Sequence, residues 1–273
     1  MSIFKEWPFI SERFYTLNGK KEIWLARVHR KGLDLRPRLL RAQTTAFWKT
    51  STYNRYIGIS FSLGAFLFSL ASILMFCSLH WSSLSNLTNV MFFAGSVPFT
   101  LAAGLQHFQS ANQIPQPRQE QHTLNKPLKL IGWNPLNAGW LSSFTQFIGT
   151  LAFNISTFNA IAAPSQPALS ILEIWTPNFE GSVLFLISGY LAFIEVDNRY
   201  WSWKPKNLSW QAVFINLLGC IAFMISAVFP QTPDADKADW VWQYSNTYTL
   251  IGAIFFFISA QLLVEESKLS PAE

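Results

Sequence analysis

Six apolar stretches, separated by polar and charged segments, make up most of the chain. They cover residues 57–79, 88–106, 142–163, 177–195, 210–229 and 246–264. Each is near the roughly 20 residues that a helix needs to cross a hydrocarbon core of about 30 Å. No Lys, Arg, Asp or Glu occurs between Arg55 and Arg118 or between Lys129 and Glu173. A soluble two-faced helix does not sustain such runs, so the pattern predicts an all-α polytopic membrane protein with six transmembrane helices.

The fourth stretch is the weakest membrane-span signal, because its charge-free part covers only residues 181–194. A helix that starts at Thr176 and Pro177 restores the length, with Thr176 as N-cap and Pro177 as the first helical residue.

Composition agrees with a lipid environment. Hydrophobic residues make up 50% of the 273 positions and charged residues 13%, against about 25% charged residues in soluble domains. Cys77 and Cys220 lie within or beside apolar stretches without a CxxC motif. We interpret both as packing residues rather than as a disulfide or a reactive pair.

The distribution of charge predicts the orientation. Lys and Arg outnumber Asp and Glu by 12 to 4 in residues 1–55, by 3 to 1 in residues 107–141 and by 3 to 1 in residues 196–209. The other three connections contain one basic residue, Lys237, against five acids. Basic segments stay on the cytoplasmic side, so we expect both termini inside, and we place the protein in the cell (inner) membrane.

The apolar stretches also share an internal pattern, [Gln/Asn]-x2-Gly-x3-Phe-x2-Ser. It is formed by Gln146, Gly149, Phe153 and Ser156 in the third stretch and by Asn216, Gly219, Phe223 and Ser226 in the fifth. The first stretch keeps Gly64 and Phe68 at the same spacing. From each glycine to a small residue in the following stretch, the distance is 38, 39 and 40 residues (Gly64 to Ala102, Gly149 to Ser188, Gly219 to Ser259). This regularity predicts three tandem parallel hairpin repeats.

These boundaries divide the chain into six parts. They are a basic cytoplasmic N-terminal segment (1–54), hairpin 1 (55–108), a polar cytoplasmic linker (109–141), hairpin 2 (142–197), hairpin 3 (198–266) and a cytoplasmic tail (267–273).

Hairpin 3 resembles the YrhK-like two-helix membrane domain of bacterial proteins. The features that match, within residues 199–266, are the Trp203 and Pro205 lead-in, then Asn216, Gly219, Phe223 and Ser226, and a closing apolar span. The earlier hairpins look like more divergent copies. The resemblance implies a membrane hairpin fold in a bacterial inner membrane, and it brings no established biochemical activity.

The N-terminal segment contains a basic cluster of Arg27, Arg30, Lys31, Arg36, Arg38 and Arg41. Basic residues beside a first span fix topology and attract anionic lipid headgroups, so we expect this arm to face the inner leaflet, with a protein partner as the alternative. Residues 33–47 are expected to lie on the membrane as an amphipathic helix. No nucleic-acid-binding motif accompanies the cluster, so we expect no nucleic-acid partner.

Catalytic chemistry is not indicated anywhere in the chain. The sequence contains no HExxH motif, no paired carboxylates on one helical face and no glycine-rich phosphate loop, so we expect no enzyme activity, cofactor or metal. Glu180 is the one carboxylate that the repeat alignment places inside a span, opposite Ala94 and Ile251. It is either a first-turn acid favoured by the helix dipole or part of an outer vestibule for cations.

Two functional classes remain open. The repeated face of Gln146, Gly149, Phe153 and Ser156, and its equivalent in the fifth stretch, is either a close helix contact or the lining of a path for a small solute or ion. The first favours a non-catalytic structural or regulatory membrane component that contacts lipids, a partner or a second copy, and the second favours a passive pore or uniporter. A continuous polar cavity along the hairpin axis would indicate the pore, and tight phenylalanine packing would indicate the structural role.

Overall fold

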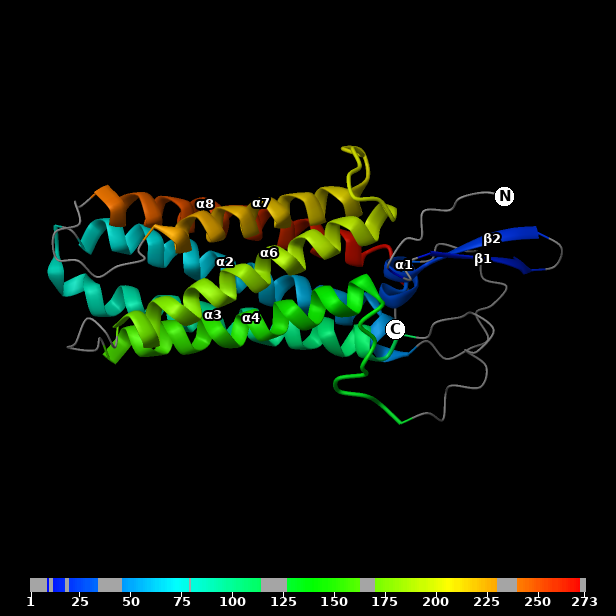
Figure 1. The fold of residues 1–273 in the computed structure, drawn as a ribbon, viewed down its shortest axis with the longest axis horizontal. Helices are drawn as coiled ribbons and strands as arrows, with labels where there is room; N and C mark the ends of the chain where they lie inside the picture. Colours follow the sequence, from blue (N-terminus) through cyan, green and yellow to red (C-terminus); the bar gives the residue numbers. More distant parts are fainter. Residues whose placement is uncertain are drawn as a thin grey trace.

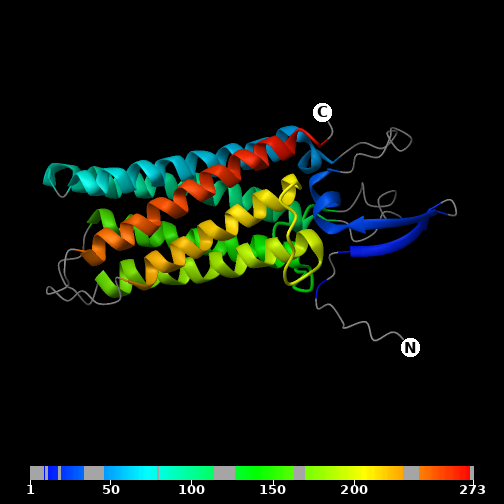
Figure 2. The same ribbon diagram turned by 90° about the horizontal axis from the view of Figure 1, so that it is seen from above.

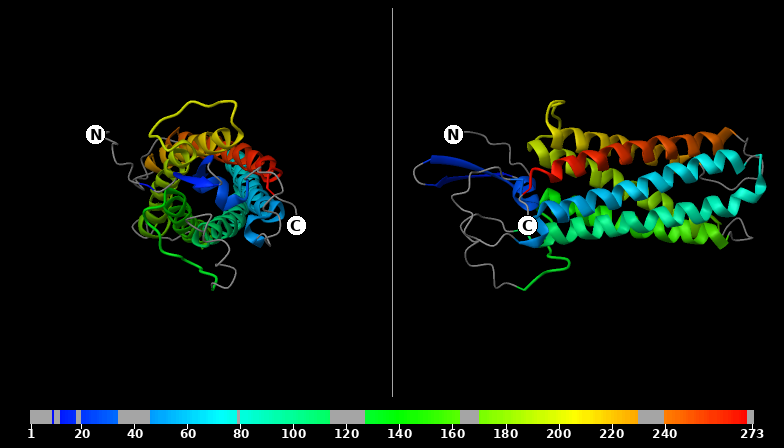
Figure 3. Two further views of the ribbon diagram at one scale, coloured as in Figure 1. Left: turned by 90° about the vertical axis from the view of Figure 1, so that its right-hand side faces the viewer. Right: turned by 180° about the vertical axis from the view of Figure 1, so that it is seen from behind.

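Six long helices of the described chain run side by side (Figures 1 and 2) and form a closed ring, which is seen from one end in Figure 3 (left). The computed structural model describes residues 9, 12–17, 20–33, 46–78, 80–113, 127–162, 170–229 and 240–270. The helices are α2 (Ser51–Ser78), α3 (Ser85–Ala111), α4 (Ala138–Ala162), α6 (Thr176–Asp197), α7 (Leu208–Val228) and α8 (Trp240–Ser267). Each helix packs against the next in chain order, and α8 returns to pack against α2.

A small N-terminal structure lies at one end of the ring. Strands β1 (Glu12–Leu17) and β2 (Lys20–Leu25) pair antiparallel, with Glu12 opposite Leu25, and lead directly into the short helix α1 (Ala26–Lys31). Seen along the bundle, α1 lies over the middle of the ring (Figure 3, left). We call this end of the bundle the α1 end. The predicted all-α fold is therefore confirmed for the bundle, and the two-stranded hairpin is an element that the sequence analysis did not predict.

Five of the described helices are long and apolar enough to cross a membrane. The helix that does not meet both conditions is α4, which has 25 residues and so matches the others in length, but which contains several Ser, Thr, Asn and Gln residues. On its outer surface α4 exposes Leu151, Ile155 and Phe158.

Short turns complete the described chain. They are the 3₁₀ turns η1 (Phe47–Lys49) and η2 (Ser82–Leu84) and the π-helical turn η4 (Ile171–Trp175). Because η4 runs directly into α6, Thr176 is not an N-cap as expected. Its hydroxyl instead donates to the carbonyl oxygen of Ile171 at 2.9 Å.

The helices of each hairpin meet at a pair of glycines. Gly64 faces Gly95 between α2 and α3, and two further glycine pairs occupy the same place in α4 with α6 and in α7 with α8. A Cβ atom on Gly219 would lie 2.7 Å from the Phe256 ring and 3.2 Å from the carbonyl oxygen of Gly252. Small residues allow such close backbone approach, so this contact fixes the spacing of the two helices in each hairpin.

Six phenylalanines fill the axis of the ring. Every one of them is at most 6% exposed, and the six are Phe68, Phe99, Phe153, Phe185, Phe223 and Phe256. Ring centroids are 4.9 Å apart for Phe153 and Phe185 and 5.0 Å apart for Phe223 and Phe256, both in edge-to-face geometry. Aromatic pairs favour this arrangement. Contacts between Phe68 and Phe223 and between Phe153 and Phe223 extend the cluster across the hairpins.

Adding bulk at the glycine pairs is expected to destabilise the bundle. For Gly149→Leu and Gly219→Leu we expect a free-energy loss of about 1–3 kcal/mol, because the facing phenylalanine and backbone leave no room for a side chain. The matched control is Gly104→Leu, since a Cβ there meets only the Phe147 ring, at 3.4 Å. Thermal unfolding of the three purified variants in detergent measures the effect. Equal midpoints for all three would show that these contacts do not set the helix spacing.

Candidate functional site

The most polar buried region of the described chain lies at the α1 end, where α1 is held by the ends of the surrounding helices. Helix α1 ends at Gly32, whose φ of 69° is the left-handed conformation common after a helix. The side-chain amide of Asn54 donates to the carbonyl oxygen of Lys31 at 2.7 Å, and the hydroxyl of Ser270 donates to the same atom at 2.9 Å. At the other end of α1, the amide of Gln113 donates to the carbonyl oxygen of Ala26 at 2.8 Å.

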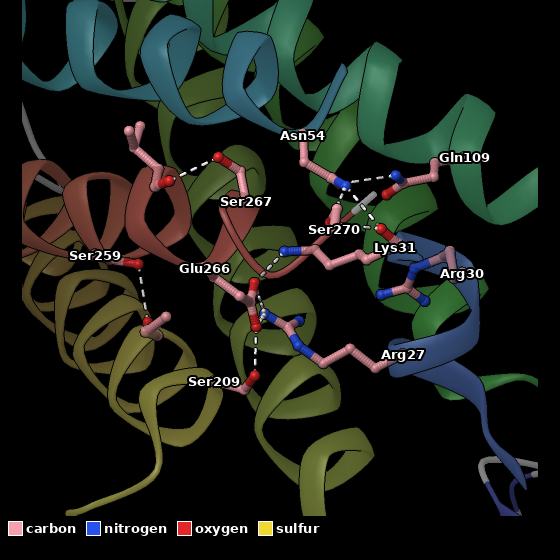
Figure 4. A network of polar contacts seen from close by, with 12 residues as sticks. Arg27, Arg30, Lys31, Asn54, Gln109, Ser209, Ser259, Glu266, Ser267 and Ser270 are labelled. Carbon is pink, nitrogen blue, oxygen red and sulfur yellow. Dashed lines mark hydrogen bonds and ion pairs between the residues drawn. The ribbon is translucent and has the colours of Figure 1, made fainter. Parts of the chain in front are cut away.

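Two cations of α1 share one carboxylate. The Nζ atom of Lys31 lies 2.5 Å from the carboxylate of Glu266 in α8, and Nη2 of Arg27 lies 3.2 Å from it. The hydroxyl of Ser209 in α7 donates to the same carboxylate. Figure 4 shows these three groups around Glu266. Charged groups are tolerated in a protein interior when they are paired and hydrogen-bonded in this way.

A second ion pair joins α1 to α6. The guanidinium of Arg30 donates to both carboxylate oxygens of Glu195, at 2.8 and 3.0 Å, and both side chains are 1% exposed. Such a bidentate contact with a carboxylate is characteristic of the arginine guanidinium. Helix α4 passes close to this pair, since a Cβ atom on Gly139 would overlap both charged groups.

The acceptors of α1 occupy corresponding positions in the hairpins. Glu195 follows Ser188 by seven residues, and Glu266 follows Ser259 by seven residues. In hairpin 1 the residue seven places after Ala102 is Gln109, a fully buried amide that donates to the Asn54 side chain at 2.9 Å. Three equivalent polar positions therefore surround α1, and two of them are acidic.

Charges at the α1 end do not cancel completely. The buried groups are three cations, Arg27, Arg30 and Lys31, and two carboxylates, Glu195 and Glu266, which leaves one excess positive charge among these five. Burial lowers the pKa of Lys31 to about 8, and the neighbouring Glu266 carboxylate opposes this effect. Lys31 is therefore still predominantly charged at neutral pH.

A cavity of about 40 Å³ lies between the phenylalanine cluster and α1. By this measure it has space for about three water molecules. Its aromatic side is formed by Phe61, Phe99, Phe185 and Phe256. Its polar lining consists of Arg27, Lys31, Gln106, Ser142, Gln146, Ser188, Asn216 and Ser259. A second cavity, among Phe68 and its neighbours, has about 10 Å³, which is too little for one water molecule.

The two predicted amides line the larger cavity. Gln146 is 9% exposed, and its amide has no hydrogen-bond partner among the described residues. The amide nitrogen of Asn216 lies 3.7 Å from the sulfur of Cys220 in its own helix. Neither amide forms a hydrogen bond to a neighbouring helix among the described residues, although the Asn216 amide nitrogen lies close to Gly189 of α6, 3.5 Å from where a Cβ atom would be.

The other predicted residues of the repeated face lie in helix contacts. Gly149 and Gly219 form the glycine pairs, and Phe153 and Phe223 belong to the axial cluster. The hydroxyl of Ser156 donates to the carbonyl oxygen of Ile174 at 2.8 Å. In hairpin 3 the hydroxyl of Ser226 contacts those of Ser245 and Thr249.

The basic arm requires a correction. Arg27, Arg30 and Lys31 were expected to face lipid, but they are at most 5% exposed and are bound to carboxylates inside the bundle. Sequence position alone did not reveal these acidic partners. Arg36, Arg38 and Arg41 lie outside the described residues, as does most of the amphipathic helix expected at residues 33–47.

Glu180 lies apart from both cavities. It is exposed near the start of α6 and belongs to neither lining. Cys77 and Cys220 are both free thiols. Trp140 and Trp210 are at most 2% exposed, and each stacks on a phenylalanine one turn later in its helix.

Glu195 and Glu266 are the site residues that the sequence analysis missed. Their seven-residue spacing from the inward-facing Ser188 and Ser259 places them on the same helical face as these serines. That spacing is the signal that identifies them.

Comparison with known proteins finds no matching family model, no matching curated protein and no matching solved structure. Within the described part of the chain, no three His, Cys, Asp or Glu side chains are grouped so as to hold a metal ion. The geometry of the site is therefore the basis for assigning a function.

The ion pair between Arg30 and Glu195 provides a direct test of how α1 is bound. Arg30→Met leaves a buried carboxylate without its partner, so we expect a loss of about 3–5 kcal/mol in stability. Replacing both residues by Met removes the unpaired charge, and most of the loss is expected to be recovered. Denaturation midpoints in detergent measure both effects.

The control is Lys268→Met, which removes an exposed pair with Glu265 and is expected to change stability by less than about 1 kcal/mol. An Arg30→Met variant as stable as this control would mean that the Arg30 pair does not hold α1 in the bundle.

Proposed function

We propose that this protein is a non-catalytic structural or regulatory component of the membrane. The observation that supports this function best is the filling of the ring axis by six phenylalanines. A path for a solute needs continuous space between the two ends of the bundle, and the side chains of Phe99, Phe185 and Phe256 separate the larger cavity from the far end. In this proposal the bundle is a scaffold, and its bound N-terminal segment is the regulated part.

The finer architecture belongs to the same proposal: six spans arranged as three tandem hairpin repeats. Support for the sixth span comes from α4, which lies in the ring beside α3 and α6 and exposes apolar side chains outward. Support for the repeats comes from the glycine pair and the axial phenylalanines that recur in each hairpin. We also propose that residues 199–266 are a YrhK-like domain.

The orientation that we propose places the α1 end and both termini in the cytoplasm, in a bacterial inner membrane. Basic residues are concentrated in the segments at the α1 end, as the positive-inside rule requires. Trp133, Trp201 and Trp203 are each more than 60% exposed there, which is typical of side chains at the level of lipid headgroups. Anionic lipids are the proposed partners of this face, and a protein partner or a second copy of the chain is the alternative.

A passive uniporter is the second candidate, and the cavity favours it. The amides of Gln106, Gln146 and Asn216 line this cavity from three different helices. The phenylalanine side chains and α1 would have to move to connect this cavity to both sides of the membrane.

Solute flux distinguishes the two functions. Proteoliposomes that contain the wild-type protein are expected to release water-soluble tracers, such as urea, glycerol, potassium and chloride, no faster than empty liposomes do, because the axis is closed. Stopped-flow light scattering and ion electrodes measure the rates. Phe153→Ala/Phe223→Ala is the control with a widened axis. Wild-type flux that is lost in Gln146→Leu would contradict the structural function and establish the uniporter.

Labelling of single cysteines tests the orientation. In a Cys77→Ser/Cys220→Ala background, a membrane-impermeant thiol reagent applied to intact cells is expected to label Ser83→Cys but not Lys129→Cys. Both positions are exposed in the structure, so access to the reagent depends on the side of the membrane. Labelling at position 129 and protection at position 83 would reverse the orientation.

A further inference from the structure

The cavity at the α1 end combines features that proteins use to bind a ligand. It is lined on one side by Phe99, Phe185 and Phe256 and on the other by Arg27 and Lys31 of α1. The two cations are each 5% exposed.

Unpartnered polar groups face this space. The amide of Gln146 has no hydrogen-bond partner in the described part of the chain, and Asn216 has only the distant sulfur contact. Nearby, the Nε atom of Arg27 is buried and has no hydrogen-bond partner among the described residues. A polar side chain as buried as Gln146, which is 9% exposed, normally has a hydrogen-bond partner, so its amide indicates an occupant that accepts hydrogen bonds.

The balance of charge specifies the sign of that occupant. Arg27 and Lys31 share the single carboxylate of Glu266, while Arg30 is neutralised by Glu195. Among these five described groups, one positive charge is in excess beside the cavity, where the low dielectric strengthens its attraction for an anion and its repulsion of a cation. Three of the long helices begin at the α1 end and three finish there, so their dipoles oppose one another. The helix dipoles therefore do not reverse the positive sign of the charge beside the cavity.

We propose that the cavity binds one small monovalent inorganic anion of the size of chloride. Arg27 and Lys31 supply the charge, and the amide N–H groups of Gln146 and Asn216 supply hydrogen bonds. The volume of about 40 Å³ excludes organic anions such as gluconate. Because the anion neutralises the cations of α1, its binding also stabilises α1 in the bundle. The proposal holds whether or not the axis conducts a solute.

Titration of the full-length protein with halide tests this proposal. Protein in nanodiscs is exchanged into sodium gluconate and titrated with sodium chloride or bromide at constant ionic strength, by calorimetry and by thermal unfolding. The expected result is saturable binding of one anion per chain and a rise in Tm over the same concentrations, because a ligand that binds the folded state stabilises it. Crystals soaked in bromide locate the anion by its anomalous signal.

Two amide variants separate this site from binding elsewhere. Gln146→Leu and Asn216→Leu keep all charges in place and are expected to weaken binding by at least about tenfold, because each removes a hydrogen bond to a charged ligand. The matched control is Gln261→Leu, an amide of α8 that is bonded to Ser62 and does not belong to the cavity lining. It is expected to bind halide as the wild type does.

Three outcomes would overturn the proposal. The first is a Tm that responds equally to gluconate and chloride, which indicates general screening. The second is saturable binding that both cavity variants retain at full affinity, which places the anion elsewhere. The third is an absence of binding in a wild-type protein that is folded. None of these outcomes depends on solute flux. Failure of the anion proposal is therefore distinguishable from failure of the structural function, which the flux measurement tests.

Discussion

Close approach of two helices at a glycine pair is the contact on which the rest of this structure depends. At Gly219 and Gly252 a backbone carbonyl oxygen lies where a side chain would otherwise be, and the Phe256 ring packs directly on the main chain. The same contact in the other two hairpins brings six aromatic rings onto one axis. With larger residues at these positions the helices would separate and the rings would no longer meet. The closed axis is thus a consequence of small residues at a few positions rather than of overall hydrophobicity.

The second constraint is electrostatic and lies at the α1 end. Inserting α1 places three cations in the interior. These charges are tolerated because they form ion pairs with Glu195 of α6 and Glu266 of α8. The remaining positive charge and the unpaired amides are left beside a cavity that the phenylalanines close. Packing along the axis and charge at its end therefore lie next to each other: phenylalanine rings occupy the axis, and the ion pairs with Glu195 and Glu266 hold α1 at its end.

The sequence was sufficient to predict the helices, because long charge-free runs have few alternatives to membrane-spanning helices. It also identified the glycines and phenylalanines of the repeated face. It did not predict the strands at residues 12–25, although Asn18-Gly19 between two short alternating segments is a strong hairpin signal. The basic arm was misinterpreted for a physical reason: charge pattern reveals that cations are present, but their burial depends on acids, Glu195 and Glu266, that are more than 160 residues away in the chain. Only the three-dimensional arrangement brings them together.

An experimentally determined structure of the full-length chain in a lipid environment, at a resolution that shows individual aromatic rings, tests the filled axis and the bound α1 most directly. We expect density for Phe153 and Phe223 packed edge to face across the axis, with the Phe68 ring tilted against Phe223, and for α1 bound to Glu195 and Glu266. An axis filled with ordered water from one end to the other, or an α1 detached from the bundle, would contradict it.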